Sequence, residues 1–249
     1  MNKLLTLLLL MVPGILMAQN EEPVIVQNVM IGVLPGHGAD FRTGMAEHNK
    51  TFHAGDAYGC RVYSIANGEN TGKYIWSMVS TWSAMDNRPS STEHDDHWDT
   101  KVAPHLMPMS NASYWQWNQS VSTNDDISEI SMLRIWWIDL KPTKQGRAME
   151  LLEMIKEVYD EKMPDEHYGV YSNTMPSTTE GRDMAIVGYM TNFAEMNEQE
   201  DFVAYFNEVH GSGSFTGFIT EWWDLMEGEG TEMWIYDEAL SGLGPQVNR

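Results

Sequence analysis

The residues best suited to chemistry in this chain are its histidines, and they are concentrated in the first half of the sequence. An imidazole accepts a proton near neutral pH and is also a common metal ligand. Of the eight histidines, only His167 and His210 lie in the second half. The others are His37, His48, His53, His94, His97 and His105. We therefore expect a catalytic or binding site to draw mainly on the first half.

His48 is the strongest single candidate because it shares a helical face with apolar residues. Met45 and Phe52 recur with it at helical spacing, between Asp40, a candidate cap, and Gly55. An imidazole that points inward from such a face could act as a general base or ligate a metal. The alternative is a core histidine that bonds to a backbone carbonyl or to water. We assign His48 as the candidate catalytic residue.

His94 and His97 are three residues apart in a second expected helix and have acidic neighbours. This spacing places two imidazoles on one helical face, where they can bind a divalent ion. The surrounding pattern is not that of a known zinc motif. An exposed acidic helix face is therefore the alternative, and we assign no metal ligand. The candidate ligand-binding residues are His53, Tyr58, Trp76, His94, His97 and Trp98.

Common cofactor motifs are absent from the sequence. It contains no Gly-x-Gly-x-x-Gly, no phosphate loop, no Gly-x-Ser-x-Gly, no His-Glu-x-x-His and no calcium loop. The single cysteine, Cys60, excludes an intrachain disulfide and is expected to be a small buried apolar side chain. We expect no cofactor. Any catalysis would be cofactor-free or would depend on haem or a divalent metal.

The formal net charge of -21 narrows the range of partners. An acidic surface repels phosphate backbones and anionic lipids, so we expect a small-molecule ligand rather than nucleic acid or a membrane surface. Residues 1–18 have a basic lead, an apolar run and a final Ala18, which is the pattern of a cleavable signal peptide. The run is too short to span a bilayer. We expect a secreted or periplasmic protein that is cut after Ala18.

The expected elements occur in the same order in both halves of the chain. Tyr58-Gly59 matches Tyr168-Gly169, and each half contains strand, helix, strand, strand, helix and strand. The division that follows is a signal peptide (1–18), a first unit (19–121), a linker (122–128), a second unit (129–238) and a tail (239–249). The tail is expected to fray from Leu240.

Each unit would place two helices on one face of a four-stranded antiparallel sheet. The other face is rich in Trp, Tyr and Met, and must be buried against another surface. The second copy can supply that surface. We predict an α+β fold in which two tandem ferredoxin-like units form an intramolecular pseudo-dimeric α+β barrel. Such a chain would be a monomer with an internal pseudo-dimer, although a homo-oligomer stays open.

The chain resembles a known superfamily in three respects. These are the order of elements, the hairpin between the second and third strands, and the stretch from Thr81-Trp82-Ser83-Ala84 to His94-Asp95-Asp96-His97-Trp98. They resemble the dimeric α+β barrel superfamily, which includes antibiotic-biosynthesis monooxygenases and stress-responsive barrel domains. The resemblance covers almost the whole mature chain, once per half. The resemblance implies that the relatives include cofactor-free oxygenases, haem proteins and isomerases. It also implies that a histidine near the second helix borders the pocket.

Our leading hypothesis is a secreted small-molecule-binding barrel with cofactor-free monooxygenase-like activity, in which His48 is the base in a pocket between sheet and helices. One alternative is a non-catalytic extracytoplasmic protein with a structural or association role. The other is a haem-handling protein with an inward histidine as axial ligand. An open cavity that touches His48 would favour the first hypothesis. A closed inter-sheet space filled by aromatic side chains would favour the structural alternative.

Overall fold

The computed structural model describes residues 22–55, 58–88, 90–108, 111–123, 130–177, 180–197 and 200–244. Its strands are β1 (Ile25–Ile31), β2 (Cys60–Ile65), β3 (Tyr74–Ser80), β4 (Asn111–Trp117), β5 (Met132–Leu140), β6 (Tyr168–Asn173), β7 (Met184–Met190) and β8 (Met226–Tyr236). Its α-helices are α1 (Gly38–Phe52), α2 (Trp82–Asp86), α3 (Thr92–Lys101), α4 (Gln145–Lys162), α5 (Phe202–His210) and α6 (Ser214–Leu225). Short 3-10 helices are η1 (Ala103–His105), η2 (Gln119–Val121) and η3 (Phe193–Asn197).

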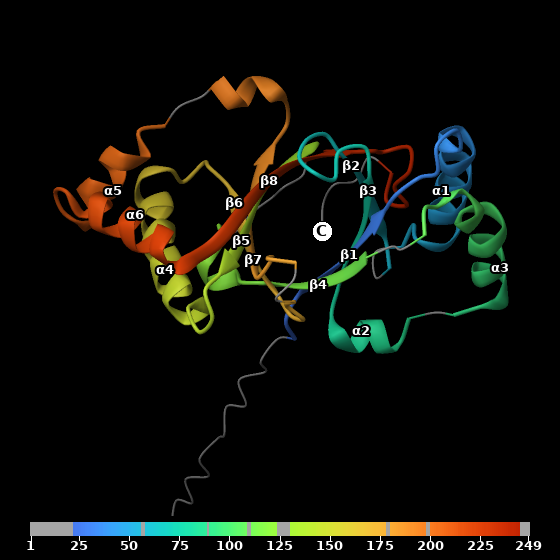
Figure 1. Ribbon diagram of the computed structural model, residues 1–249, viewed down its shortest axis with the longest axis horizontal. Helices are drawn as coiled ribbons and strands as arrows, with labels where there is room; N and C mark the ends of the chain where they lie inside the picture. Colours follow the sequence, from blue (N-terminus) through green and yellow to red (C-terminus); the bar gives the residue numbers. More distant parts are fainter. Residues whose placement is uncertain are drawn as a thin grey trace, which may run out of the picture.

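The eight strands form one closed antiparallel barrel in the order β1-β3-β2-β8-β5-β7-β6-β4. Strands of the first half are neighbours, as are strands of the second half. The two groups meet where β2 pairs with β8 and where β4 pairs with β6. Helices α1 and α3 lie on one side of the barrel, and α4, α5 and α6 lie on the opposite side (Figure 1). The α+β fold around eight antiparallel strands is as predicted.

The alternation of side chains along the strands separates an inner from an outer layer. Trp115, Trp137 and Trp234 belong to a buried cluster built from inward-facing strand positions. Their ring centroids are 5.0 Å apart for Trp115 and Trp137, and 5.8 Å apart for Trp137 and Trp234. The prediction that part of the aromatic set fills the space between the sheets agrees with this cluster. The barrel interior is therefore largely a packed aromatic core.

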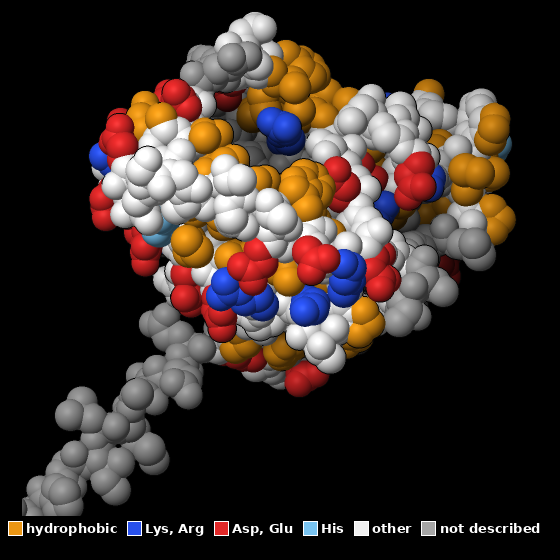
Figure 2. Space-filling view, turned by 60° about the vertical axis from the view of Figure 1, so that its left-hand side comes forward, with side chains coloured by type: hydrophobic (Ala, Val, Ile, Leu, Met, Phe, Trp, Pro, Cys, Tyr) orange, Lys and Arg blue, Asp and Glu red, His pale blue; other side chains and the backbone are white. Residues whose placement is uncertain are grey.

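The two outer layers differ in composition. On the side of α4, α5 and α6, aromatic and aliphatic residues such as Phe206, Phe218 and Trp222 pack against the barrel. This side comes forward in Figure 2, where acidic side chains are mixed with a few Lys and Arg. On the other side, α1 and α3 pack over a smaller cluster that includes Phe41 and Met45. His48, His53, His94 and His97 lie in this second layer.

Some predicted boundaries in the second half are wrong. Periodicity predicts a single helix over residues 195–209, but the structure divides it into η3 and α5, and Asp201 caps α5 by accepting from the Ala204 amide. The sequence near Phe218 predicts only a short turn of helix, whereas the structure has the twelve-residue helix α6. Alternation predicts a last strand from Glu232, but the strand begins six positions earlier, at Met226, because the whole stretch pairs with β5. A Gly- and Glu-rich segment gave no strand signal.

In the first half, the predicted ends of one helix and two strands also differ from those in the structure. Helix α1 begins at Gly38 after His37, without a side-chain cap from Asp40. Tyr58 precedes β2 rather than lying within it. The sequence predicts a strand over residues 111–121, but the strand ends at Trp117 and is followed by η2. These differences move element ends by a few residues and leave the order of elements unchanged.

The segment from Leu240, which we expected to fray, is packed as far as residue 244. Leu240 and Ser241 are 1% and 0% exposed. The Ser241 hydroxyl accepts a hydrogen bond from the Val62 amide at 2.8 Å. A Cβ at Gly242 would lie 2.0 Å from the carbonyl oxygen of His53, so only glycine permits this approach. The expected signal peptide and residues 124–128 of the expected linker lie outside the described residues.

Candidate metal centre

The close packing of α1 and α3 brings together histidines that are distant in sequence. A Cβ at Gly44 on α1 would lie only 2.0 Å from the carbonyl oxygen of Lys101 at the end of α3. Glycine therefore allows the two helices to approach closely. His48 faces α3 from α1, and His94 and His97 face α1 from α3. His53 follows α1 directly.

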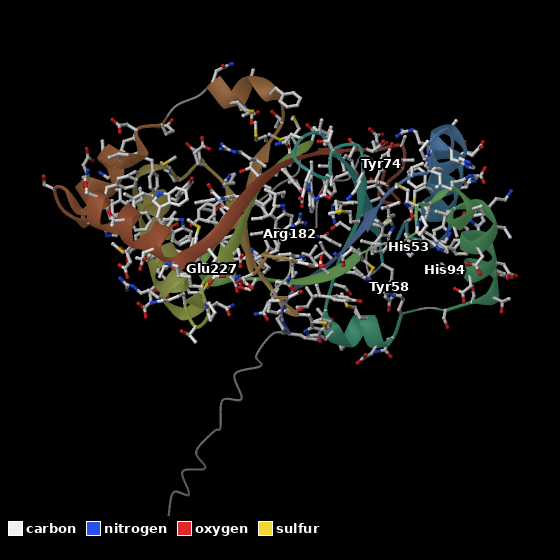
Figure 3. All side chains as sticks on the ribbon, viewed as in Figure 1. His53, Tyr58, Tyr74, His94, Arg182 and Glu227 are labelled. Carbon is white, nitrogen blue, oxygen red and sulfur yellow. The ribbon has the colours of Figure 1, made fainter. Side chains whose placement is uncertain are left out.

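The ring nitrogens of His53 and His94 face each other. Their Nε2 atoms are 3.4 Å apart, and both side chains lie in the space between α1 and α3 (Figure 3). His53 Nδ1 is 3.2 Å from the carbonyl oxygen of Tyr58. His94 Nδ1 is 2.9 Å from a carboxylate oxygen of Asp95. Both partners can only accept, so each Nδ1 carries a proton.

The neutral form of each ring then presents an Nε2 lone pair to the other. Two ring nitrogens that face each other at 3.4 Å can share either a proton or a metal ion. One ring nitrogen each from His48, His53 and His94 lie within 4.8 Å of one another. Three imidazole nitrogens at this spacing form a candidate set of metal ligands.

His48 is the deepest member of the cluster and is 1% exposed. Its Nδ1 has no hydrogen-bond partner among the described residues, and the same holds for Nδ1 of His97. Burying a polar atom without a partner costs about 1–3 kcal/mol. An ion bound by these rings would offset that cost.

Burial keeps two imidazoles of the cluster, those of His48 and His53, neutral at pH 7. Burial, reinforced by the neighbouring imidazoles, lowers the pKa of His48 to about 3. Burial also lowers the pKa of His53 to about 4 and outweighs its bond to the Tyr58 carbonyl, which acts in the opposite direction. Neutral imidazole is the form that ligates metals. At neutral pH these two rings are therefore ready to bind an ion without first losing a proton.

Aromatic side chains and acidic residues surround the cluster. The ring centroids of Phe52 and Trp98 lie 5.1 Å and 5.3 Å from that of His48. The side chain of His94 is 29% exposed, which leaves a way in from solvent. Exposed carboxylates follow the outer face of α3, and they attract cations to the site. They are Glu93, Asp95, Asp96 and Asp99.

Asn49 fixes α1 to the barrel and to the C-terminal segment. It is 0% exposed. Its side chain accepts from Trp76 Nε1 at 3.1 Å and donates to the Leu240 carbonyl at 2.7 Å. Trp76 in turn packs against His53 with ring centroids 5.1 Å apart. The orientation of α1, and hence of His48, depends on these buried contacts.

The structure brings together most of the predicted site residues. The rings of His53, His94, His97 and Trp98 all contact that of His48, and Trp76 packs against His53. Tyr58 contributes only its carbonyl oxygen, because its hydroxyl donates toward the backbone of Ala84 and Asn87. The acidic face expected on this helix is exposed, while the rings of His94 and His97 contact His48 on the side of α1.

Sequence reasoning missed three contributors to the site and did not group His48, His53 and His94 as candidate metal ligands. Asn49 and Asp95 were adjacent to predicted histidines, and adjacency was their only signal. Gly44 gave no signal, because its role depends on the approach of α3. His37 and His105 form a separate pair, with Nδ1 atoms 3.1 Å apart.

The cluster fits a small ion better than a macrocycle. Five rings surround His48 with centroids 4.8–5.4 Å away, and they cover the space in which a porphyrin would have to lie. Tetrahedral zinc with nitrogen ligands at about 2.0–2.1 Å has ligand atoms roughly 3.4 Å apart, which is the observed separation of the two Nε2 atoms. The two cavities described in the barrel are not lined by histidine.

Solved structures share this fold. A provisionally named monooxygenase from Fusobacterium nucleatum has a TM-score of 0.53 at 11% identity, with 87% of this chain and 93% of that chain covered. A second, from Lactobacillus acidophilus, has a TM-score of 0.52 at 11% identity, with 86% and 94% covered. A provisionally named chlorite dismutase has a TM-score of 0.52 at 10% identity, with 90% and 98% covered. At these identities the likeness shows the fold alone.

No protein-family model and no curated protein matches the sequence. Within the described residues, no helix combines the length and the apolar character that crossing a membrane requires.

Proposed function

We propose that this protein binds a divalent transition-metal ion through His48, His53 and His94 and acts on a small molecule at the exposed side of that ion. The observation that carries the proposal is the convergence of three imidazole nitrogens within 4.8 Å, two of them in neutral, low-pKa rings. Three imidazoles with one side open is a donor set suited to zinc, iron or copper. His97 lies beside them as a further donor.

The structural neighbours support an oxidation-type reaction. Two are provisionally named as monooxygenases and another as anthrone oxidase-like. Iron or copper held by imidazoles supplies redox chemistry when bound. The residues of this chain would hold the ion, keep its ligands unprotonated, and shield it from water with Phe52 and Trp98.

A cofactor-free role for His48 as general base is less favoured. A base works best when its pKa is near the working pH, and the pKa of His48 is lowered to about 3. At neutral pH such an imidazole has little affinity for a proton. Metal ligation needs the imidazole in its neutral form, which the lowered pKa maintains at neutral pH.

We also propose a division of the barrel into two repeated units and export of the protein from the cytoplasm. The strand order within each half supports two tandem ferredoxin-like units that form the barrel as an internal pseudo-dimer. We also propose that residues 1–18 direct export and are removed after Ala18. The intact mass of protein recovered from the periplasm or medium tests this, and a chain that retains its first residues would contradict it.

Calorimetric titration of the metal-free chain with Zn²⁺, Fe²⁺ and Cu²⁺ tests the proposed function. We expect one ion per chain. The variants His48→Gln, His53→Gln and His94→Gln should each weaken binding by at least about tenfold, because each removes one nitrogen ligand. His105→Gln is the matched control, since His105 belongs to the other histidine pair.

Equal affinity in all four variants would exclude the cluster as the site. Failure of the wild-type chain to bind any of the three ions would favour the structural alternative. A Soret absorbance band in the purified protein would instead favour the haem alternative. If the cluster binds an ion, oxygen consumption with candidate aromatic substrates then tests the reaction class.

A further inference from the structure

Residues 237–244, which follow β8, leave the strands of the second half and pack against the first half. We call these residues the strap. In Figure 1 the red chain after β8 reaches the side of the barrel on which α1 lies. At one end, the Arg42 guanidinium on α1 donates to both carboxylate oxygens of Asp237, at 2.5 Å and 3.2 Å. At the other end, the Tyr236 hydroxyl donates to the Gly244 carbonyl. Both ends of the strap are therefore fixed.

The middle of the strap lies against the backbone of His53. A Cβ at Gly242 would lie 2.0 Å from the carbonyl oxygen of His53 and 2.8 Å from that of Asn49. The same His53 carbonyl accepts a hydrogen bond from the Cys60 amide at 3.0 Å, and the Cys60 carbonyl accepts from the Leu243 amide at 3.3 Å. Two backbone hydrogen bonds therefore connect the strap to His53 through the first residue of β2.

The strap also contacts the residues that orient the His53 ring. His53 Nδ1 is 3.2 Å from the Tyr58 carbonyl oxygen. A Cβ at Gly59, the next residue, would lie 2.3 Å from Leu243 Cδ2, so the Leu243 side chain packs directly on this backbone. A displacement of the strap would move the Tyr58 carbonyl as well as the backbone of His53.

A second route from the strap to His53 passes through buried side chains. Leu240 belongs to the buried cluster beneath α1, and its carbonyl accepts from the Asn49 side chain at 2.7 Å. Asn49 also accepts from Trp76 Nε1, and the Trp76 ring packs against the His53 ring. Buried polar networks whose members are all satisfied specify one arrangement of the groups around them. The strap therefore reaches His53 both through its backbone and through Asn49 and Trp76 beside its ring.

We propose that the strap is a positioning element of the metal centre, in which Gly242 and Leu243 hold His53 where its Nε2 faces His94. The inference rests on the proposed function and adds that ion binding by the first half depends on a segment of the second. His48 and His94 lie within helices, whereas His53 follows the last residue of α1, so its place depends on contacts outside the helix. Such support matters because binding groups must be held within about 0.5 Å of their productive positions.

Zinc titration of full-length variants tests this inference. Gly242→Ala should weaken zinc binding at least about tenfold and should change the visible spectrum of bound Co²⁺, because the added Cβ displaces His53. Gly230→Ala on β8, where a Cβ would meet no described atom within 4 Å, is the matched control and should change neither. Leu152→Ala, in the buried cluster around α4, should lower the melting temperature without changing zinc affinity, which separates positioning from general stability.

Unchanged zinc affinity in Gly242→Ala overturns the inference, as does an equal loss of affinity in Leu152→Ala. If Gly242→Ala does not fold, Leu243→Ala decides the matter, since it removes the contact with the backbone after Tyr58 without adding atoms, and unchanged affinity there overturns the inference. Failure of the wild-type chain to bind zinc would count against the proposed function instead. Amide exchange of the metal-free chain then tests the strap alone. Gly242→Ala should speed exchange of the Cys60 amide, which donates to His53, and unchanged exchange would overturn the inference.

Discussion

The orientation of His94 depends on a single carboxylate. Asp95 accepts from His94 Nδ1 at 2.9 Å, which directs Nε2 toward His53. Carboxylates that hold a ligating imidazole in this way raise its basicity, and their loss typically costs 10–100-fold in metal affinity. The corresponding partner of His53 is a backbone carbonyl and cannot be removed by substitution. Asp95 is therefore the residue through which orientation can be tested.

We predict that Asp95→Ala weakens zinc binding about tenfold without changing the number of ions bound. Asp96→Ala is the matched control, because Asp96 is an exposed neighbour on the same helix and removes the same charge. Competition with a chromophoric chelator measures both affinities. Equal weakening in the two variants would assign the effect to general electrostatics and contradict an orienting role.

The low pKa values of His48 and His53 also predict how stability depends on pH. In the folded chain they are about 3 and about 4, below the ordinary value of 6.5. Between pH 6.5 and about 4 the unfolded chain therefore binds protons that the folded chain does not. The free energy of unfolding of the metal-free protein should fall as pH drops through this window, by up to ~1.4 kcal/mol per pH unit for each group.

Urea unfolding at a series of pH values measures this slope. His48→Gln should reduce the slope between pH 6.5 and 4, because it removes one of the two groups. His105→Gln should leave it nearly unchanged. A slope in His48→Gln equal to that of the wild-type chain would mean that His48 is not held neutral by its surroundings.

Helix packing decides whether the histidines can meet at all. Alanine is favoured over glycine within a helix by about 1 kcal/mol, yet a Cβ at Gly44 would lie 2.0 Å from the Lys101 carbonyl oxygen. Overpacking of this kind costs about 1–3 kcal/mol and shifts the backbone. We predict that Gly44→Ala lowers the melting temperature and weakens zinc binding, because α3 moves away from His48.

Gly146→Ala, at the start of α4, provides the comparison, since a Cβ there meets nothing within 4 Å. It should leave zinc binding unchanged and stability equal or higher. If Gly44→Ala behaves like Gly146→Ala in both measurements, the close approach of α1 and α3 does not position the site.

The packing of helices was only partly predictable from the sequence. Periodicity identified α1 and its inward His48, because an apolar stripe reports which face is buried. It could not show that His94 and His97 face the same space, since an acidic helix gives almost no apolar stripe. Nor could it find Gly44, whose importance comes from a contact between two helices. The order of strands was predictable because alternation and turns are local signals, whereas the extent of β8 was not.

The two helical layers on opposite sides of the barrel differ in their side chains. By the repeat of elements, Ile155 on α4 is the predicted counterpart of His48 on α1, and it packs into the cluster built around Phe206 and Trp222. The layer over the first half instead contains four histidines in contact. The helical layer over the second half is therefore apolar, whereas the layer over the first half contains a histidine cluster. Closure of the barrel within one chain pairs each of its eight described strands with two others of the same chain.

Zinc K-edge X-ray absorption of the zinc-loaded full chain tests the central claim most directly. The account predicts at least three imidazole nitrogens at about 2.0–2.1 Å from one ion per chain, and loss of imidazole scattering when His48, His53 and His94 are replaced together by glutamine. Coordination by oxygen alone, or a spectrum that the triple replacement does not change, would contradict it.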